Sequence, residues 1–186
     1  LGADIDGERA GDLFGVSVSL DSDGSHVAIG AEENDGLTLE EGATQVYNNV
    51  GHVRVYQYSG GSWSQVGKDI DGKTNGDHTG VSVSLDSDGS HVAIGSPDNG
   101  KGHVRVYEYS GGSWSQLGAD INGEAAGDLF GISVSLDSDG SHVAIGGEKN
   151  DGGGSNAGHA RVYEYSGGSW SQLGADINGE AAGDLF

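Results

Sequence analysis

Short runs in which apolar and polar residues alternate recur along the chain, and Gly and Asp separate them. Residues 15–20 read GVSVSL, which places Val16, Val18 and Leu20 on one face of an extended segment. This period of two predicts a strand with one face against a core. A second strand is expected directly after the Asp-Ser-Asp-Gly sequence at 21–24, which predicts a tight hairpin turn between the two strands.

Two further strands complete the pattern. Residues 52–58 read HVRVYQY, with Val53 and Val55 on one face and Arg54 on the other. A Ser-Gly-Gly turn then leads into a fourth strand, which runs through Trp63 to about residue 70. No window shows a sustained spacing of 3.6 residues between apolar positions, so we predict an all-β chain.

The same text restarts along the chain, which is therefore a tandem repeat. Repeat one occupies residues 1–65, repeat two 66–116 and repeat three 117–172, and a partial repeat follows at 173–186. The repeats differ in length between their second and third strands, where repeat one carries a long insertion at 32–50. Because loops tolerate such changes, this segment is predicted to be a surface loop.

Four antiparallel strands in a repeat of about 50 residues are typical of a β-propeller blade. We therefore predict an all-β fold with propeller-type blades of four antiparallel strands, about three blades plus a partial repeat. Closed propellers have about four to eight blades. Three alternatives remain open: a fragment of a longer propeller, a ring closed by oligomerisation, and an open array of stacked repeats.

The start of each repeat resembles the FG-GAP repeat, the unit of the integrin α-subunit propeller and of tandem-repeat secreted surface proteins of marine bacteria and algae. Repeat two departs from the FG element, because it has Thr79-Gly80 in that place. The resemblance implies a β-propeller fold and an extracellular role in adhesion or structure. The matching positions are Phe14-Gly15 and Phe130-Gly131 for the FG element, and Gly30-Ala31, Gly95-Ser96-Pro97 and Gly146-Gly147 for the GAP element.

Composition narrows the function classes. The chain has 186 residues with 37 Gly and no Cys, which excludes a disulfide scaffold. Asp and Glu number 29 against 8 Lys and Arg, and the net charge is −21. Nucleic acid is therefore not an expected partner, and membrane insertion is not expected because no apolar run is long enough. Residues 1–7 lack a signal-peptide pattern, so the chain is cytosolic or its targeting segment lies outside these residues.

Acidic residues recur at a regular spacing in the loop that precedes each first strand. Calcium prefers carboxylate and carbonyl oxygens, and loops present them at positions such as 1, 3, 5 and 9. Repeat two has Lys73 at the fifth position, where a cation opposes binding. Two interpretations remain open, a solvated acidic turn and a loop that calcium orders. The candidate metal ligands are Asp4, Asp6, Glu8, Asp12, Asp120, Asn122, Glu124, Asp128, Asp176, Asn178, Glu180 and Asp184.

Histidine, serine and aromatic residues also recur in every repeat. Histidines such as His26 and His52 start strands without a nearby Cys or second His, so a turn-capping or cross-strand role is expected in place of zinc binding. Ser, His and Asp recur without forming one special set, and we predict that the chain is not an enzyme. Trp63, Trp114 and Trp170 are expected to fill the space between blades, with sugar stacking as the alternative.

The insertion in repeat one carries an apolar excess, which indicates an interface. Its candidate partner-binding residues are Leu37, Leu39, Val46 and Tyr47. We predict an extracellular or cell-surface adhesion or scaffold protein that mediates protein interactions, with calcium as the candidate cofactor. The expected partners are a protein or glycan on the cell surface or matrix, and further repeats or copies of the chain. The alternatives are a carbohydrate-binding propeller module and a structural subunit of an extracellular filament.

Overall fold

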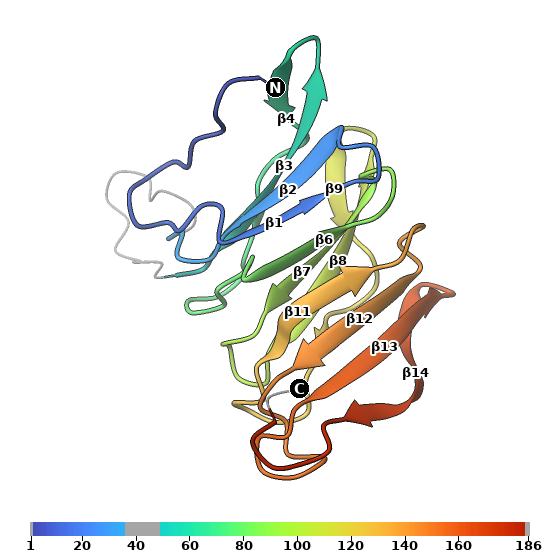
Figure 1. The fold of residues 1–186 in the computed structure, drawn as a ribbon. Coiled ribbons are helices and arrows are strands. Elements are labelled where there is room, and N and C mark those ends of the chain that lie inside the picture. The colour runs from blue at the N-terminus through green and yellow to red at the C-terminus, as the bar shows by residue number, and fades with distance from the viewer. Residues whose placement is uncertain (1, 36–48, 185–186) are drawn as a thin grey trace.

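The computed structural model describes residues 2–35 and 49–184, which form three sheets stacked side by side (Figure 1). Blade 1 consists of β1 (Ser17–Leu20), β2 (His26–Ala31), β3 (His52–Ser59), β4 (Ser62–Gln65) and β5 (Ile70–Asp71). Blade 2 consists of β6 (Ser82–Leu85), β7 (His91–Ser96), β8 (His103–Ser110), β9 (Ser113–Gln116) and β10 (Ile121–Asn122). Blade 3 consists of β11 (Phe130–Leu136), β12 (His142–Gly147), β13 (His159–Ser166) and β14 (Ser169–Asn178).

Each blade is an antiparallel meander, and the predicted all-β fold is confirmed. In blade 1, β1 pairs with β2, β2 with β3, and β3 with both β4 and β5. The last two strands form one interrupted outer strand, which is continuous in blade 3 as β14. Within the described part of the chain, no helix has the length and apolar character needed to cross a bilayer.

The turns follow from the residues that the sequence places in them. Gly24, in the turn between β1 and β2, has φ of 75°. Gly60 and Gly61, between β3 and β4, have φ of 61° and 93°. Residues with a Cβ atom rarely adopt this left-handed backbone region, because the Cβ atom meets the following carbonyl oxygen. Glycine is therefore the residue that lets each hairpin close.

Two apolar clusters lie between the blades and form the core. Alternation in the strands directs the apolar side chains of one blade toward those of the next. The cluster between blades 1 and 2 contains Ala28, Val53, Val55, Ile70, Val83, Leu85, Val92 and Ile94. The cluster between blades 2 and 3 contains Ala93, Val104, Val106, Ile121, Phe130, Val143, Ile145 and Tyr163.

The first strands of neighbouring blades approach closely, and small residues make this approach feasible. Ser17 Oγ donates a hydrogen bond to the Gly80 carbonyl oxygen at 2.6 Å, and Ser82 Oγ donates to the Gly131 oxygen at 2.8 Å. A Cβ atom added to Gly30 would lie 2.1 Å from the Gly80 oxygen. Serine and glycine therefore join successive blades through side-chain-to-backbone hydrogen bonds.

The outer faces of the two end blades are apolar and exposed. Residues 15–30 and 80–95 have identical sequences, yet Leu85 is 6% exposed and Leu20 is 60% exposed. Blade 1 covers Leu85, whereas no described residue covers Leu20 to the same extent. We call Val16, Val18 and Leu20 the leading face of the arc, and Leu173 and Ile177 its trailing face.

Candidate functional site

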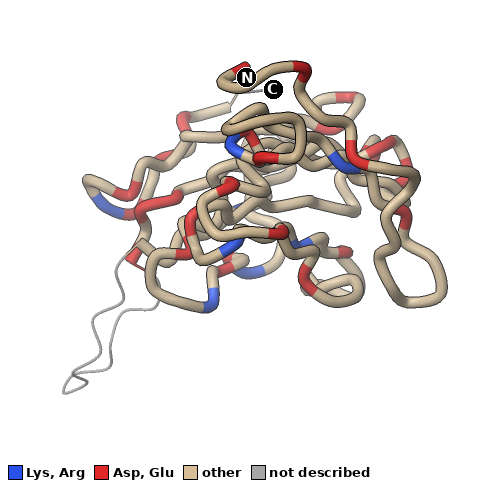
Figure 2. The backbone as a smooth tube through the Cα atoms, turned by 90° about the horizontal axis from the view of Figure 1, so that it is seen from below, with Lys and Arg blue, Asp and Glu red and all other residues tan. Residues whose placement is uncertain are grey.

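A buried arginine occupies the third position of the third strand in every blade. These residues are Arg54 in β3, Arg105 in β8 and Arg161 in β13, and all three are less than 10% exposed. A guanidinium stays charged at every relevant pH, so its burial requires anionic partners or hydrogen-bond acceptors. The loops around the arginines supply these partners, in a chain whose acidic residues are spread over many loops (Figure 2).

In blade 1, two carboxylates from different repeats meet at Arg54. Arg54 Nε donates to Asp69 Oδ1 at 2.9 Å and Nη2 donates to Asp69 Oδ2 at 2.7 Å, a bidentate pair. Nη2 also pairs with Glu8 Oε1. Glu8 precedes β1 and Asp69 precedes β5, so the fold joins residues that are far apart in the chain.

Blade 3 repeats this arrangement. Arg161 Nε donates to Asp176 Oδ1 at 2.8 Å, Nη2 donates to Asp176 Oδ2 at 2.7 Å, and Nη2 pairs with Glu124. The hydrogen bond from Arg161 lowers the pKa of Asp176 to about 2. These clusters, each of one arginine and two carboxylates, are the arginine clusters of blades 1 and 3.

The arginine of blade 2 lacks the glutamate partner that the other two arginines have. Lys73 stands where blades 1 and 3 have Glu8 and Glu124. Arg105 Nη2 pairs with Asp120 Oδ2 at 3.0 Å. Burial raises the pKa of Asp120, but hydrogen bonds from Arg105 and Gln116 outweigh burial and lower this pKa to about 2.

Each arginine lies near a buried histidine at the start of the same strand. His52, His103 and His159 are at most 6% exposed, and each has a ring Nε2 atom without a hydrogen-bond partner. Burial, together with the adjacent arginine, lowers the pKa of all three imidazoles. These imidazole rings are therefore neutral at pH 7, and their unpartnered nitrogen atoms are available as metal ligands.

Two of these histidines belong to groups with metal-ligand spacing. Ligand atoms of Glu8, His52 and Asp69 lie within 4.8 Å of one another, and the same holds for the equivalent group Glu124, His159 and Asp176. The carboxylates of both groups already bind Arg54 and Arg161. A metal ion at either place would therefore compete with a guanidinium for the same oxygens.

The acids of the predicted calcium loop at 120–128 bind different partners in the structure, although Glu124 and Asp128 both approach Asn150 Nδ2. First-position Asp120 binds the arginine of the blade before it, and fifth-position Glu124 binds the arginine of the blade after it. Ninth-position Asp128 is buried and accepts a hydrogen bond from Asn150 Nδ2 at 2.7 Å. Among described residues, none of the groups of three close His, Asp or Glu ligand atoms contains two acids of one such loop.

The remaining candidate ligands follow the same division. Asp12 is buried and accepts a hydrogen bond from Asn34 Nδ2 at 3.0 Å. Calcium binding stays a prediction, as does the partner role of Leu37, Leu39, Val46 and Tyr47, which lie outside the described residues. The exposed candidates are Asp4, Asp6, Asn122, Asn178, Glu180 and Asp184.

The turns between first and second strands hold a Ser-His-Asp constellation. His26 Nδ1 lies 2.7 Å from Asp21 Oδ2 and 3.1 Å from Ser25 Oγ. In a catalytic triad the histidine uses different ring nitrogens for its serine and its aspartate. Here both partners share Nδ1, and the arrangement closes the turn. The same contacts recur in the turns of blades 2 and 3.

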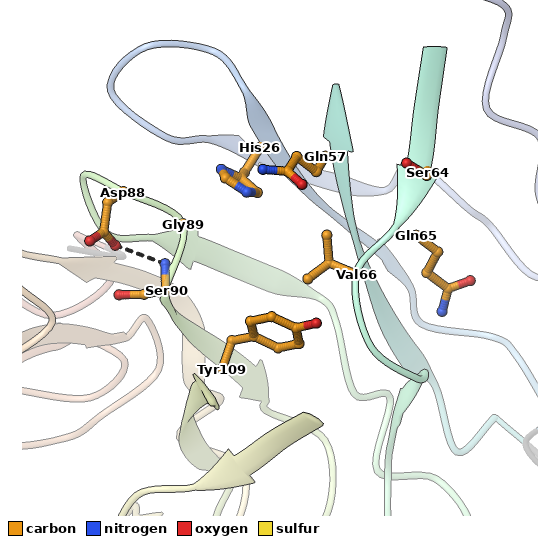
Figure 3. Close-up of a pocket in the computed structure, with 9 residues that line it drawn as sticks. All are labelled: His26, Gln57, Ser64, Gln65, Val66, Asp88, Gly89, Ser90 and Tyr109. Carbon is orange, nitrogen blue, oxygen red and sulfur yellow. Dashed lines mark hydrogen bonds between the residues drawn. The ribbon is translucent and has the colours of Figure 1, made fainter. Parts of the chain in front are cut away.

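A small polar pocket of about 280 Å³ lies between blades 1 and 2 (Figure 3). His26 lines it from β2, Tyr109 from β8, and the Asp88-Gly89-Ser90 turn from blade 2. A Cβ atom on Gly89 would lie 2.6 Å from His26 Cγ, so the histidine packs against the glycine of the next turn. This contact joins the start of β2 in blade 1 to the turn between β6 and β7 in blade 2.

The tryptophans take part in the packing of blades. Trp114 Nε1 donates to the Val66 oxygen at 2.9 Å, and Trp170 Nε1 donates to the Leu117 oxygen at 2.9 Å. Val66 follows β4 of blade 1 and Leu117 follows β9 of blade 2, so each hydrogen bond joins a tryptophan to the preceding blade. The expected space-filling role is thus observed for these two residues, and sugar stacking stays a prediction.

The comparisons with known proteins identify the fold. No family model and no curated protein matches the chain. Solved structures do match it, and they are β-propellers. A putative 6-phosphogluconolactonase from Bacteroides fragilis has a TM-score of 0.58 and 12% identity over 88% of this chain and 40% of its own. Sqt1 from Saccharomyces cerevisiae has a TM-score of 0.52 and 12% identity over 89% of this chain and 36% of its own.

The prediction that the chain is not an enzyme is wrong, because proteins of this fold include named lactonases. A periplasmic gluconolactonase from Pseudomonas aeruginosa also matches, with a TM-score of 0.51 and 16% identity over 87% of this chain and 56% of its own. Several matching proteins are therefore named as lactonases, so this propeller fold accommodates hydrolases. A repeated Ser, His and Asp pattern does not exclude an active site built by loops on such a fold. These similarities show that the chain has a β-propeller fold. The chain spans less than two thirds of the length of each of these matched propellers.

Proposed function

We propose that this chain is an adhesion or scaffold module of the extracellular space or cell surface, which associates through the end faces of its arc. The observation that carries the proposal is the pair of exposed apolar faces at the two ends. Val18 on the leading face is 66% exposed, whereas its counterpart Val83 in blade 2 is 9% exposed. Exposed contiguous apolar faces of this kind mark interaction sites.

The internal interfaces indicate what fits these faces. The leading face has the same sequence as the surface of blade 2 that blade 1 covers. The trailing face lies on β14, the outer strand of blade 3, and the corresponding part of blade 1 contributes Ile70 to the first core cluster. Any further blade with this repeat sequence therefore offers the complement of each face, whether it comes from further repeats of the parent chain or from a second copy. In a solution of this chain, we expect the trailing face of one copy to cover the leading face of another.

Hydrogen-bonding groups support the same orientation. Ser22 Oγ donates to the Ser87 oxygen at 2.7 Å, and Ser87 Oγ donates to the Ser138 oxygen at 2.6 Å. This ladder runs from each blade to the next. At a junction between two copies, Ser138 Oγ would continue it by donating to the Ser22 oxygen of the second copy. Such a head-to-tail contact is heterologous, so it produces a ring where it closes and a filament where it does not.

Light scattering over a concentration series tests this proposal. The wild-type chain should gain mass as concentration rises, and Val18→Asp or Ile177→Asp should each reduce association by at least tenfold because a carboxylate would be buried at the junction. Ala126→Asp, which adds the same charge in an exposed loop, is the matched control and should behave as wild type.

A mixture of the two face variants tests the orientation. Each variant keeps one intact face, so the mixture should form a complex of two chains and stop there. A wild-type chain that stays monomeric at every concentration would overturn the proposal. A Val18→Asp variant that associates like wild type would also overturn it.

A further inference from the structure

The three blades contain an internal comparison at their buried arginines. Arg54 and Arg161 each have two carboxylate partners, an aspartate and a glutamate. Arg105 has the aspartate, but Lys73 replaces the glutamate. The surrounding strands have nearly the same sequence. A comparison of the blades therefore shows how the arginine is paired with and without a glutamate carboxylate.

Arg105 lacks one bond that the other two arginines make, because Arg54 Nε and Arg161 Nε each donate to an aspartate. Its Nε and Nη1 atoms are buried, and no hydrogen-bond acceptor of the described chain partners them. Its side chain is 6% exposed, and its Nη1 lies 3.8 Å from Asp77 Oδ2, beyond hydrogen-bond distance. A buried donor on a charged group without an acceptor is costly, so an added acceptor would bind favourably here.

Asp77 cannot serve as that acceptor without losing its present partners. Its Oδ2 accepts hydrogen bonds from the backbone N–H of Lys73 at 2.8 Å and of Thr74 at 3.1 Å. Its Oδ1 accepts from Asn99 Nδ2 at 2.6 Å. These bonds hold the carboxylate in the loop and away from the arginine.

Lys73 adds a second cation that has freedom to move. Its side chain is 54% exposed, and Nζ lies 3.1 Å from Gln116 Oε1 and 3.5 Å from Asp120 Oδ1. Arg105, Lys73 and Asp120 together carry a net charge of +1. The equivalent residues of blade 1, Arg54, Glu8 and Asp69, carry a net charge of −1. A ligand carboxylate therefore meets less repulsion at blade 2 than at the arginine cluster of blade 1.

We propose that Arg105 and Lys73 bind the side-chain carboxylate of a glutamate from an acidic peptide, in the place that Glu8 and Glu124 hold in the other blades. Glu8 and Glu124 are the precedents, because both are glutamates of a polypeptide that follow a glycine. Glu8 and Glu124 pair with the Nη2 atom of their arginines. At Arg105 the ligand carboxylate approaches the same guanidinium, accepts a hydrogen bond from its unpartnered Nη1, and pairs with Lys73 Nζ at the exposed edge. This site is separate from the leading and trailing faces, so it adds a ligand to the proposed scaffold.

Proton–nitrogen NMR of the arginine Nε–H groups tests the site. The probe is N-acetylglutamate α-amide, which carries the glutamate carboxylate alone, and N-acetylglutamine α-amide is its neutral control. The Arg105 resonance should shift with the first probe, with a dissociation constant on the order of 1 mM, and should not shift with the second. The resonances of Arg54 and Arg161 should stay in place.

Two variants with the same charge change separate the site from general electrostatics. Lys73→Glu supplies the missing carboxylate, so the Arg105 resonance should already be shifted and probe binding should weaken at least tenfold. Lys101→Glu, at an exposed position of the same blade, should bind the probe as wild type does. An Arg105 resonance that ignores 50 mM probe, estimated as about fifty times the expected dissociation constant, would overturn the proposal. So would equal probe binding in Lys73→Glu, and tighter binding of glucuronate would assign the site to an acidic sugar and overturn the peptide assignment.

Discussion

Two leucines in identical sequence provide a direct test of blade packing. Leu20 and Leu85 occupy the same position in two identical segments, but Leu85 is 6% exposed and Leu20 is 60% exposed. Replacing each with alanine removes the same atoms from the same local structure. A difference between the two variants in the free energy of unfolding therefore measures how much packing against a neighbouring blade stabilises the leucine.

The expected magnitudes follow from burial. Leu85 lies in the cluster between blades 1 and 2, and removal of a buried leucine side chain costs about 2–5 kcal/mol. With a loss of about 3 kcal/mol, the melting temperature of a chain of this size should fall by about 6–12 °C. Leu20 is mostly in water already, so Leu20→Ala should cost less than about 1 kcal/mol in the isolated chain.

Differential scanning calorimetry at low and high protein concentration measures both effects. At low concentration only Leu85→Ala should lower the melting temperature strongly. At high concentration Leu20→Ala should also fall below wild type, because the leading face would then be covered and binding to the folded state raises the melting temperature. Equal losses for the two variants at low concentration would refute the packing argument.

Two other predictions concern charge and close approach. Asp120 and Asp176 have a pKa of about 2 in the folded chain, against an ordinary value of 3.8 for aspartate. Their contribution to stability is therefore present above pH 3.8 and is lost as pH falls toward 2. Urea unfolding between pH 5 and pH 2 should show this decline, and a flat profile would contradict it. A Cβ atom on Gly95 would lie 2.0 Å from the Gly131 backbone oxygen, whereas the closest atom for Gly146 is a side-chain oxygen at 2.3 Å. Gly95→Ala should therefore destabilise by more than about 2 kcal/mol and Gly146→Ala by less, as measured by urea unfolding, and the reverse order would contradict the blade-to-blade approach.

The strands and turns could be predicted from the sequence because their causes are local. Alternation in residues 15–20 and the glycine at position 24 determine a strand and a hairpin without reference to the rest of the chain. The exposure of Leu20 could not be predicted in this way, because the identical text around Leu85 is buried. Burial here depends on whether another blade lies against the face.

The candidate site was predicted only in part, for the same reason. The acidic spacing was visible in the sequence, but it pointed to ligands that converge within one loop. In the structure Glu8 meets Asp69 of the following repeat at Arg54. The repeated arginine in the third strand, next to a repeated histidine, was the signal in the sequence for this meeting point. Its meaning required knowledge of which loops surround each strand.

The division of each acidic loop between two arginines makes the connection between blades unequal along the arc. The loop between blades 2 and 3 fastens both neighbours, because Asp120 binds Arg105 and Glu124 binds Arg161. The loop between blades 1 and 2 fastens blade 1 through Asp69, but toward Arg105 it offers only Asp77 Oδ2 at 3.8 Å, and its Lys73 pairs with Gln116 and Asp120 near the surface. Under tension, or during partial unfolding, the arc should therefore part first between blades 1 and 2, and the two later blades should behave as one mechanical unit.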